Sequence, residues 1–295
     1  MFGQITISDY SSDWALDARN VDRVTPGYLT REQVIEFYGT LGIAGIEVCH
    51  AYWHDCEAAR VKQLAADAGL PIVAYVAQVD LAVPAGGRAE ALDEISRLLH
   101  RTAALGAARI FLIPATYKEE FTVPEQRAWL IENLRLAAER AASMGIELIS
   151  ENIDYPPTRV FMGRGTDCAE ICAEVGSPAF GLIYDVAAHL FVDEDPQITL
   201  NSMFPSARHV HLKNYRPLDA AEQPERFRAA ESGKCYTGTT LDGGVLNIEA
   251  MVQELQRRHY QGFLQIEYQG MDDPRVALKH NVAYLQGILT RLAPA

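Results

Sequence analysis

The chain has 295 residues, 48% of them hydrophobic, and a formal net charge of −13. This length and composition are enough for a sizeable buried core, and no segment resembles a long disordered tail. The acidic balance argues against a general nucleic-acid binder and against binding to an anionic membrane surface, because both need many exposed Lys and Arg side chains.

The first residues contain neither a basic segment nor a long apolar segment, and no stretch approaches the length of a membrane span. The five cysteines are odd in number and widely scattered. Cys168 and Cys172 are spaced as neighbours on one helix face, where packing explains them better than a zinc site. We therefore expect free thiols and a protein of the reducing cytoplasm.

Strand-like and helix-like segments alternate along the whole chain. Short apolar runs predict eight strands, at 4–7, 45–48, 71–78, 108–113, 146–151, 180–185, 209–213 and 263–267. Capping residues, prolines and glycines predict a helix after each strand, in chain order from 30, over 55–68, over 88–105, over 124–145, and from 166, 196, 247 and 274. In the first of these helices, Thr30 and Gln33 have the spacing of a capping box.

The strand–helix units predict an α/β fold of the (β/α)₈ TIM barrel type, as a single domain over 1–295. The strands are apolar on both faces, which is typical of a parallel sheet covered by helices. A doubly wound sheet is the alternative, but no strand is followed by the G-x-G-x-x-G turn of a dinucleotide site. The one long irregular segment, 214–244, is expected to cover the substrate or to contact a partner subunit, including a second copy of the chain.

Each of the last four strands delivers a metal-competent side chain at or near its C-terminal end: Glu151, Asp185, His211 and Glu267. A single acid in this place is explained by helix capping, but in a barrel all four strand ends converge on one mouth, where active sites are built. The three carboxylates would repel one another unless a cation lies between them. Oxygen donors with one imidazole and no thiolate suit Mn²⁺, Mg²⁺ or Co²⁺. We expect one divalent ion and favour Mn²⁺.

The runs E-N at 151–152, Y-D at 184–185, H-x-H-x-K at 209–213 and I-E-Y at 266–268 resemble the sugar phosphate isomerase/epimerase group of xylose isomerase-like barrels. That group includes ketose 3-epimerases, hydroxypyruvate isomerases and inosose dehydratases, and it is related to the type II AP endonucleases. The resemblance implies that the four strand-end residues bind one divalent ion. It also implies that Glu151 and Glu267 double as acid and base.

Such a site supports two reactions. An α-hydroxy carbonyl that chelates the ion has an acidified C–H, because the enediolate formed is bound to a cation. Carboxylates on both sides of that carbon can move the proton from one face to the other, which epimerises a ketose or keto-polyol. If a leaving hydroxyl lies β to the carbanion, the same enolate eliminates it. We favour the isomerase or epimerase, with a lyase that dehydrates an inosose or cleaves a 3-keto-glycoside as the alternative.

Two further classes of protein, an endonuclease and a non-catalytic barrel, agree less well with the sequence. A metal-dependent endonuclease of this fold has many more histidines than the eight present here, and the net charge of −13 opposes DNA binding. A non-catalytic barrel that serves as a subunit is expected to lose at least one metal ligand, whereas all four are present.

We predict substrate contacts at His50, His189, Lys213 and Arg216. His50 follows the second strand and its Glu47. Lys213 ends the metal-binding seventh strand, and Arg216 follows it. A structural histidine or a solvated rim lysine explains the first and third of these residues almost as well. His189 takes the place of a residue that the resembling enzymes carry one position earlier, where this chain has Ala188.

Three other residues near the mouth have two interpretations. His209 shares the strand face of His211, one layer deeper, and we expect it to pack or to support a ligand by a hydrogen bond. Arg159 and Arg164 either receive a phosphate or form salt bridges, which is the simpler explanation in so acidic a protein. The pair Lys213-Asn214 replaces the Lys-Asp usual in the resembling enzymes, so no single activity transfers to this chain.

Overall fold

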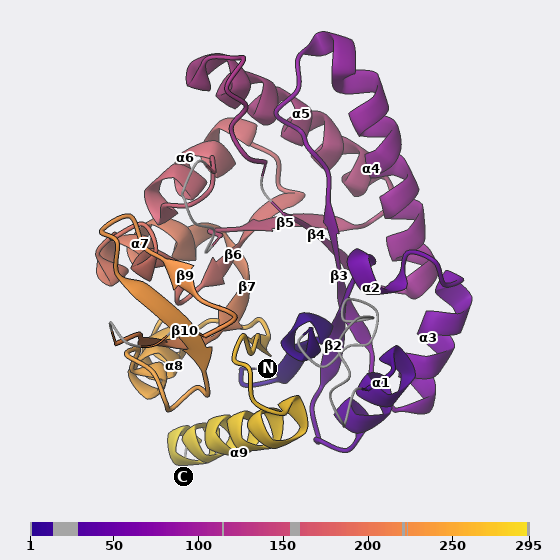
Figure 1. The fold of residues 1–295 in the computed structure, drawn as a ribbon. Helices are drawn as coiled ribbons and strands as arrows, with labels where there is room; N and C mark the ends of the chain where they lie inside the picture. Colours follow the sequence, from indigo (N-terminus) through magenta and orange to yellow (C-terminus); the bar gives the residue numbers. More distant parts are fainter. Residues whose placement is uncertain are drawn as a thin grey trace.

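Eight short parallel strands close into a barrel in the order β1-β11-β7-β6-β5-β4-β3-β2. The computed structural model describes residues 2–13, 29–113, 115–153, 160–219, 222 and 224–293. Helices surround the strands (Figure 1). The barrel strands are β1 Ile5–Ser8, β2 Gly45–Cys49, β3 Ile72–Gln78, β4 Arg109–Ile113, β5 Glu147–Glu151, β6 Phe180–Asp185, β7 Ala207–Leu212 and β11 Leu264–Ile266. The predicted (β/α)₈ barrel is confirmed.

Most of the outer helices begin within one residue of the predicted start, but the helix predicted from 55 begins three residues later and the helix predicted from 88 begins three residues earlier. The longer ones are α1 Arg31–Gly39, α3 Ala58–Asp67, α4 Ala85–Leu105, α5 Val123–Ser143, α6 Gly165–Val175, α7 Pro196–Met203, α8 Ile248–Arg257 and α9 Pro274–Leu292. Thr30 and Gln33 form the predicted capping box at the start of α1. Asn247 caps α8 by accepting from the Ala250 N–H. The described residues also form short helical turns, η1 Asp9–Ser12, α2 His50–Trp53, η3 Ala188–Leu190 and η4 Phe204–Ser206.

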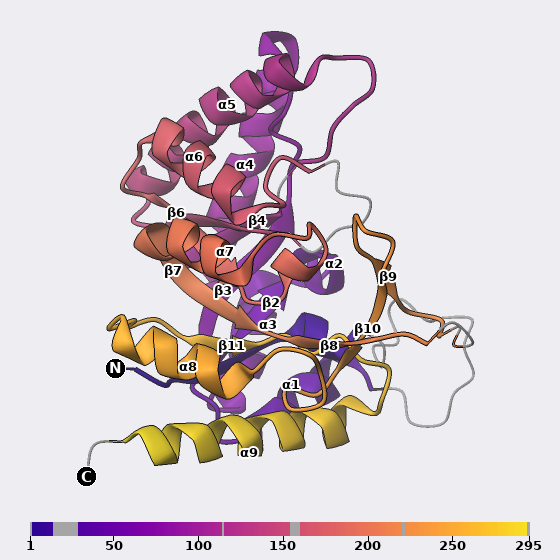
Figure 2. The same ribbon diagram turned by 90° about the vertical axis from the view of Figure 1, so that its left-hand side faces the viewer.

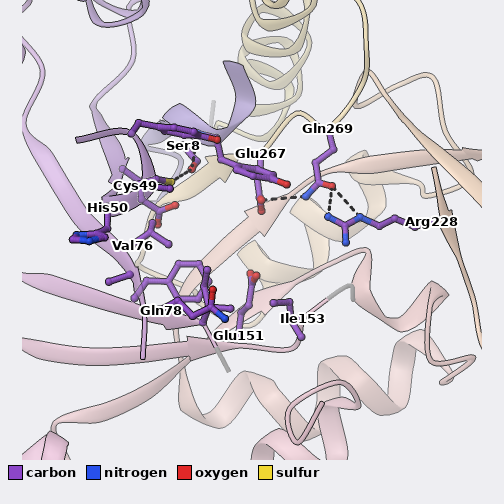
Figure 3. Close-up of a pocket in the computed structure, with 17 residues that line it drawn as sticks. Ser8, Cys49, His50, Val76, Gln78, Glu151, Ile153, Arg228, Glu267 and Gln269 are labelled. Carbon is purple, nitrogen blue, oxygen red and sulfur yellow. Dashed lines mark hydrogen bonds between the residues drawn. The ribbon is translucent and has the colours of Figure 1, made fainter. Parts of the chain in front are cut away.

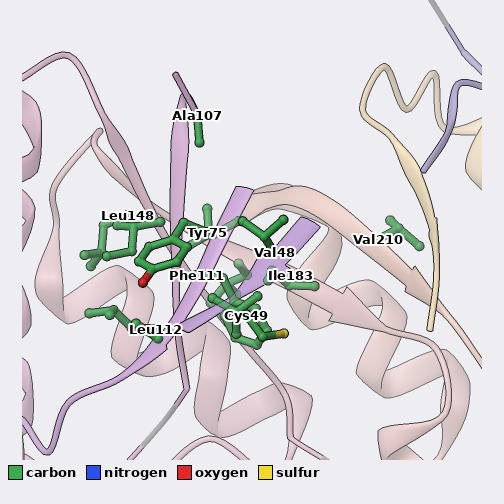
Figure 4. Packing of buried hydrophobic residues seen from close by; sticks show 14 of the residues in the cluster. Val48, Cys49, Tyr75, Ala107, Phe111, Leu112, Leu148, Ile183 and Val210 are labelled. Carbon is green, nitrogen blue, oxygen red and sulfur yellow. The ribbon is translucent and has the colours of Figure 1, made fainter. Parts of the chain in front are cut away.

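Apolar side chains fill the interior of the barrel and the space between strands and helices (Figure 4). Val48, Phe111, Leu148 and Ile183 come from four different strands, and each exposes at most 4% of its surface. All five cysteines are free, as predicted. Within the described ranges, no helix is both long enough and apolar enough to cross a membrane.

The strand register decides which polar side chains meet at the mouth of the barrel. β7 lies between β6 and β11, and its His211 is paired with Asp185 of β6 and with Gln265 of β11. Glu151 is the last residue of β5, and Glu267 directly follows β11. The C-terminal ends of these four neighbouring strands therefore bring all four predicted metal ligands to one end of the barrel.

The segment 214–244 is not irregular, contrary to our expectation. It forms an antiparallel sheet in the order β8-β10-β9, with β8 Asn214–Pro217, β9 Arg228–Ala229 and β10 Cys235–Thr239. This sheet stands beside one end of the barrel (Figure 2). Asn214 holds the base of the sheet, because its Nδ2 donates to Leu241 O at 2.8 Å and Leu246 O at 3.0 Å. A contact of this segment with a partner subunit stays a prediction.

Candidate active site

A cavity of about 320 Å³ opens at the carboxyl ends of the barrel strands. Three carboxylates line it, Glu47 from β2, Glu151 from β5 and Glu267 after β11, and Arg228 of β9 lies at its edge. Figure 3 shows Glu151 and Glu267 pointing toward one another across this space. The volume falls within the range of about 300–1,000 Å³ that is usual for small-ligand sites.

His211 lies between the two facing glutamates. Its Nδ1 is 3.1 Å from Glu151 Oε2 and 3.0 Å from Glu267 Oε2, and all three side chains are buried. These three residues offer ligand atoms that all lie within 4.8 Å of one another. Neighbouring ligands around an ion with bonds of about 2.1 Å stand about 3 Å apart at right angles. The spacing and the donor types therefore fit one divalent ion.

Asp185 and Lys213 adjoin this group. Lys213 Nζ lies 2.8 Å from Asp185 Oδ2 and 2.8 Å from Glu267 Oε2, so the ammonium joins the two carboxylates. Asn152 fixes the backbone of Asp185, because its Oδ1 accepts from Asp185 N at 2.9 Å and its Nδ2 donates to Asp185 O at 3.0 Å. The structure thus brings Asp185 to the mouth. The Lys213 ammonium lies between Asp185 and the cluster of Glu151, His211 and Glu267.

Burial and neighbouring charges shift the pKa values of the cluster in different directions. Burial raises the pKa of Glu151, although Lys213 and His211 oppose the shift. Burial would also raise the pKa of Glu267, but the same two cations outweigh it and hold this pKa far below its usual value. Burial would lower the pKa of His211, but Glu47, Glu151 and Glu267 raise it well above its usual value. The Lys213 ammonium and the imidazole of His211 are thus the groups whose positive charge offsets the negative charge of the carboxylates.

The predicted substrate contacts fall into two groups. His50 lines the cavity, and its Nδ1 lies 2.6 Å from the Tyr75 hydroxyl oxygen. Lys213 is buried beside the metal-competent cluster, with a side chain that is 1% exposed. His50 therefore lies where a substrate contact is expected. Lys213 does not line the cavity and adjoins it through its ion pair with Glu267.

His189 and Arg216 lie elsewhere. The turn η3 directs His189 Nδ1 toward Val186 O, at 2.9 Å, and the ring lines a separate depression beside α7 and α8. Arg216 on β8 binds both carboxylate oxygens of Glu222, at 3.0 and 2.8 Å, in a largely exposed ion pair. Neither residue lines the cavity that contains Glu151 and Glu267, so the structure does not bring them to the predicted substrate site.

Several polar residues of the cavity were missing from our predictions, among them Gln269 and Arg228. Gln269 Nε2 donates to Glu267 Oε1 at 3.2 Å. Arg228 donates from Nε and Nη2 to Gln269 Oε1, at 3.2 and 2.9 Å. Gln269 stands two positions after Glu267, a spacing that indicates the same side of an extended segment. Arg228 has no comparable sequence pattern, because it lies on a two-residue strand inside a segment that we expected to be irregular.

Of the other residues expected near the mouth, His209 is packed in the interior and Arg164 is ion-paired. His209 is fully buried, and burial lowers its pKa well below the usual value, so it is a neutral, packed side chain. Arg164 forms an ion pair with Glu231, which agrees with the salt-bridge interpretation. Arg159 lies outside the described residues.

Asp9 is a buried carboxyl in the same wall as Glu47. It accepts hydrogen bonds from Cys49 N at 3.0 Å and from Trp53 Nε1 at 2.8 Å. Burial raises the pKa of Asp9 to about 7, because these hydrogen bonds only partly offset the loss of water. In the unfolded chain an Asp side chain has a pKa of about 3.9.

This difference predicts a pH-dependent stability. Between these two pKa values the folded protein keeps the Asp9 proton that the unfolded chain releases. The stabilisation of the folded state that depends on this proton is therefore complete below about pH 4 and is lost as the pH rises to about 7. The free energy of unfolding falls by up to about 1.4 kcal/mol per pH unit over this range. Urea denaturation of the wild type and of Asp9→Asn, at pH 5 to 8, measures it. The slope should be smaller in the variant, and equal slopes contradict the assignment.

The fold and this acidic mouth define a class, the (β/α)₈ barrels with a candidate metal centre at the carboxyl ends of their strands. Residues 35–288 match the family described as xylose isomerase-like TIM barrel, and the chain belongs to this family.

Two curated relatives are similar over most of their length. A 2-oxo-tetronate isomerase from Cupriavidus necator is 25% identical over 214 residues, 72% of each chain. An inosose dehydratase from Geobacillus thermodenitrificans is 24% identical over 270 residues, 85% of each chain. Among solved structures, an IolI protein with a bound zinc atom superposes with a TM-score of 0.72 at 11% identity, over 98% of this chain and 97% of that one.

Proposed function

We propose that the protein is a divalent-metal-dependent isomerase or epimerase that acts on a ketose or keto-polyol. The observation that carries the proposal is the pair of buried glutamates, Glu151 and Glu267, that face each other across the cavity with His211 between them. The similarity to a 2-oxo-tetronate isomerase supports the reaction class. The IolI protein, which has the same fold, binds a zinc atom, and this supports the binding of a metal ion by this protein.

Glu151, His211 and Glu267 would hold the ion. Asp185 would be the fourth ligand if its ion pair with Lys213 is broken. When bound, the ion supplies a positive charge that stabilises negative charge developing on the substrate oxygens. Carboxylates with one imidazole suit Mn²⁺, Mg²⁺ or Co²⁺. Lys213 offsets part of the remaining negative charge, because its ammonium also lies 2.8 Å from Glu267 Oε2.

The two glutamates also move the proton. Glu151 and Glu267 lie on opposite sides of the cavity, so one carboxylate removes a proton from one face of the substrate carbon and the other returns a proton to the opposite face. Neighbours hold Glu267 at both oxygens, Gln269 at Oε1 and Lys213 and His211 at Oε2. His50 and Arg228 line the same cavity and are placed to orient the substrate hydroxyls.

The second candidate is a dehydratase with the same site. Its support is the similarity to an inosose dehydratase over 85% of both chains. The same proton abstraction leads to loss of water when the substrate has a hydroxyl β to the carbanion. The substrate, rather than the arrangement of glutamates, decides between the two outcomes.

Incubation in D₂O separates these reactions. The Mn²⁺-loaded protein is mixed with a panel of ketoses, 2-oxo-tetronate and inososes, and the products are analysed by mass spectrometry and NMR. Deuterium incorporated without loss of water supports the isomerase or epimerase, and loss of water supports the dehydratase. No exchange with any α-hydroxy carbonyl compound, with metal bound, contradicts both.

A further inference from the structure

Glu47 is the third carboxylate of the cavity, and the proposed reaction gives it no role. It belongs to β2, is 1% exposed, and is paired in register with Ser8 of β1. Its Oε2 lies 3.6 Å from His211 Nε2, whereas Glu151 and Glu267 approach the other ring nitrogen of the same imidazole. His211 therefore stands between one carboxylate on its Nε2 side and two on its Nδ1 side.

The two atoms of the 3.6 Å contact, Glu47 Oε2 and His211 Nε2, both lack a hydrogen bond within the part of the chain that the structure describes, and both are buried. A buried polar atom without a partner costs roughly 1–3 kcal/mol. A relative movement of roughly 0.5 Å brings the pair to hydrogen-bond distance and satisfies both atoms.

A neutral imidazole has one N–H and one lone pair, and a metal takes the lone pair. For His211 to present its lone pair on Nδ1, toward Glu151 and Glu267, the proton must be on Nε2. In a buried site this N–H needs an acceptor, and metal-binding histidines regularly donate it to a carboxylate. Glu47 Oε2 is the carboxylate oxygen that faces it.

We propose that Glu47 is a positioning residue that accepts the Nε2–H of His211 and thereby fixes the ring with Nδ1 directed at the ion. The inference rests on the proposed metal-dependent function. Glu47, His209 and His211 also offer ligand atoms within 4.8 Å of one another, which raises the alternative of a second ion below the first. That alternative requires His211 to give up its Nε2 proton while Nδ1 binds the first ion.

Two variants of Glu47 test the proposal. Glu47→Met keeps the length of the side chain and removes the acceptor, so Mn²⁺ affinity measured by isothermal titration calorimetry should fall roughly 10- to 100-fold. Glu47→Gln keeps a neutral acceptor oxygen and should restore most of this loss. In the Mg²⁺-loaded protein, ¹⁵N chemical shifts of His211 should show Nε2–H in the wild type and Glu47→Gln, and a mixture of tautomers in Glu47→Met.

The matched control is Asp9→Asn, which changes another buried carboxylate of the same wall that bonds to Cys49 and Trp53. It should leave metal affinity and the His211 tautomer unchanged. If Glu47→Met does not fold, Glu47→Ala takes its place. If Glu47→Met or Glu47→Ala keeps the Mn²⁺ affinity and the His211 tautomer of the wild type, the inference is wrong, while the proposed function stands. The inference is also wrong if Glu47→Gln loses as much Mn²⁺ affinity as Glu47→Met. Two ions per wild-type chain also overturn it, and a wild type that binds no ion overturns the proposed function as well.

Discussion

His211→Ala should bind little or no Mn²⁺ after dialysis, and Asp185→Ala should bind markedly less than the wild type. His211 contributes the Nδ1 that lies within 3.1 Å of both facing glutamates, so its loss opens the centre of the cluster. Loss of Asp185 removes a carboxylate and also frees Lys213 from one of its two ion pairs. The freed ammonium then competes with the ion for Glu267. Metal content per chain, by mass spectrometry after dialysis, measures both effects.

The control is Asp195→Ala. Asp195 caps α7, where its side chain accepts from Gln197 N, and it takes no part in the cavity. This variant should lose some stability, roughly 1 kcal/mol for a helix cap, and keep its metal. Full metal occupancy in both His211→Ala and Asp185→Ala would rule out the proposed ligand set. Loss in His211→Ala alone would reduce it to Glu151, His211 and Glu267.

The barrel and its acidic mouth were predictable because two local patterns coincide. A short apolar run followed by an acid marks a strand that leaves the core, and the strand predicted at 180–185 is β6 Phe180–Asp185 to the residue. Capping residues mark the helix that follows, as Thr30 and Asn247 do. Both patterns depend only on neighbours in sequence, so they can be recognised before the fold is known.

The failures concern side chains whose direction is set by contacts distant in sequence. His189 lies only four residues beyond Asp185, but the turn η3 directs its ring toward Val186 O, away from the cavity. Strand parity predicts a side for Lys213 but not its partner. The ion pair with Asp185 follows from the pairing of β6 with β7, whose register shifts between Leu182 and Ile183.

Arg228 shows a further limit of prediction from the sequence. It reaches the cavity because β9 pairs with β10, and β10 pairs with β8 next to the barrel. Each of these strands is short, and none has a clear alternation of polar and apolar residues. The sheet is therefore specified by long-range contacts, among them the hydrogen bonds of Asn214 to Leu241 O and Leu246 O.

Glu151→Gln and Glu267→Gln should each lower the turnover number by a factor of roughly 10² to 10⁴, the usual contribution of a positioned acid or base. Glutamine keeps the size and one donor oxygen, so a modest loss of metal affinity is expected. The loss should be larger at position 267, because Glu267 Oε2 contacts both His211 and Lys213, at 3.0 and 2.8 Å. Steady-state kinetics at saturating Mn²⁺ separate the chemical effect from the loss of metal.

The matched control is Glu147→Gln, the same substitution at the start of the strand that ends in Glu151. Glu147 pairs with Arg109 at 2.7 Å and with Arg208 at 3.0 Å, at the opposite end of β5 from the cavity. Its loss should change stability and leave turnover unchanged. A fall in turnover equal to that of Glu151→Gln would mean that β5 responds as a structural unit.

Deuterium exchange distinguishes the two glutamates from each other. If each serves one face of the substrate carbon, either single variant still exchanges the proton on the side of the surviving carboxylate and forms no epimer. A dehydratase with one base loses exchange in one variant and retains it in the other. If both variants keep near-normal turnover with metal bound, the two-carboxylate mechanism is wrong. Lys213, whose side-chain nitrogen lies 2.8 Å from Glu267 Oε2, then becomes the next group to test by substitution.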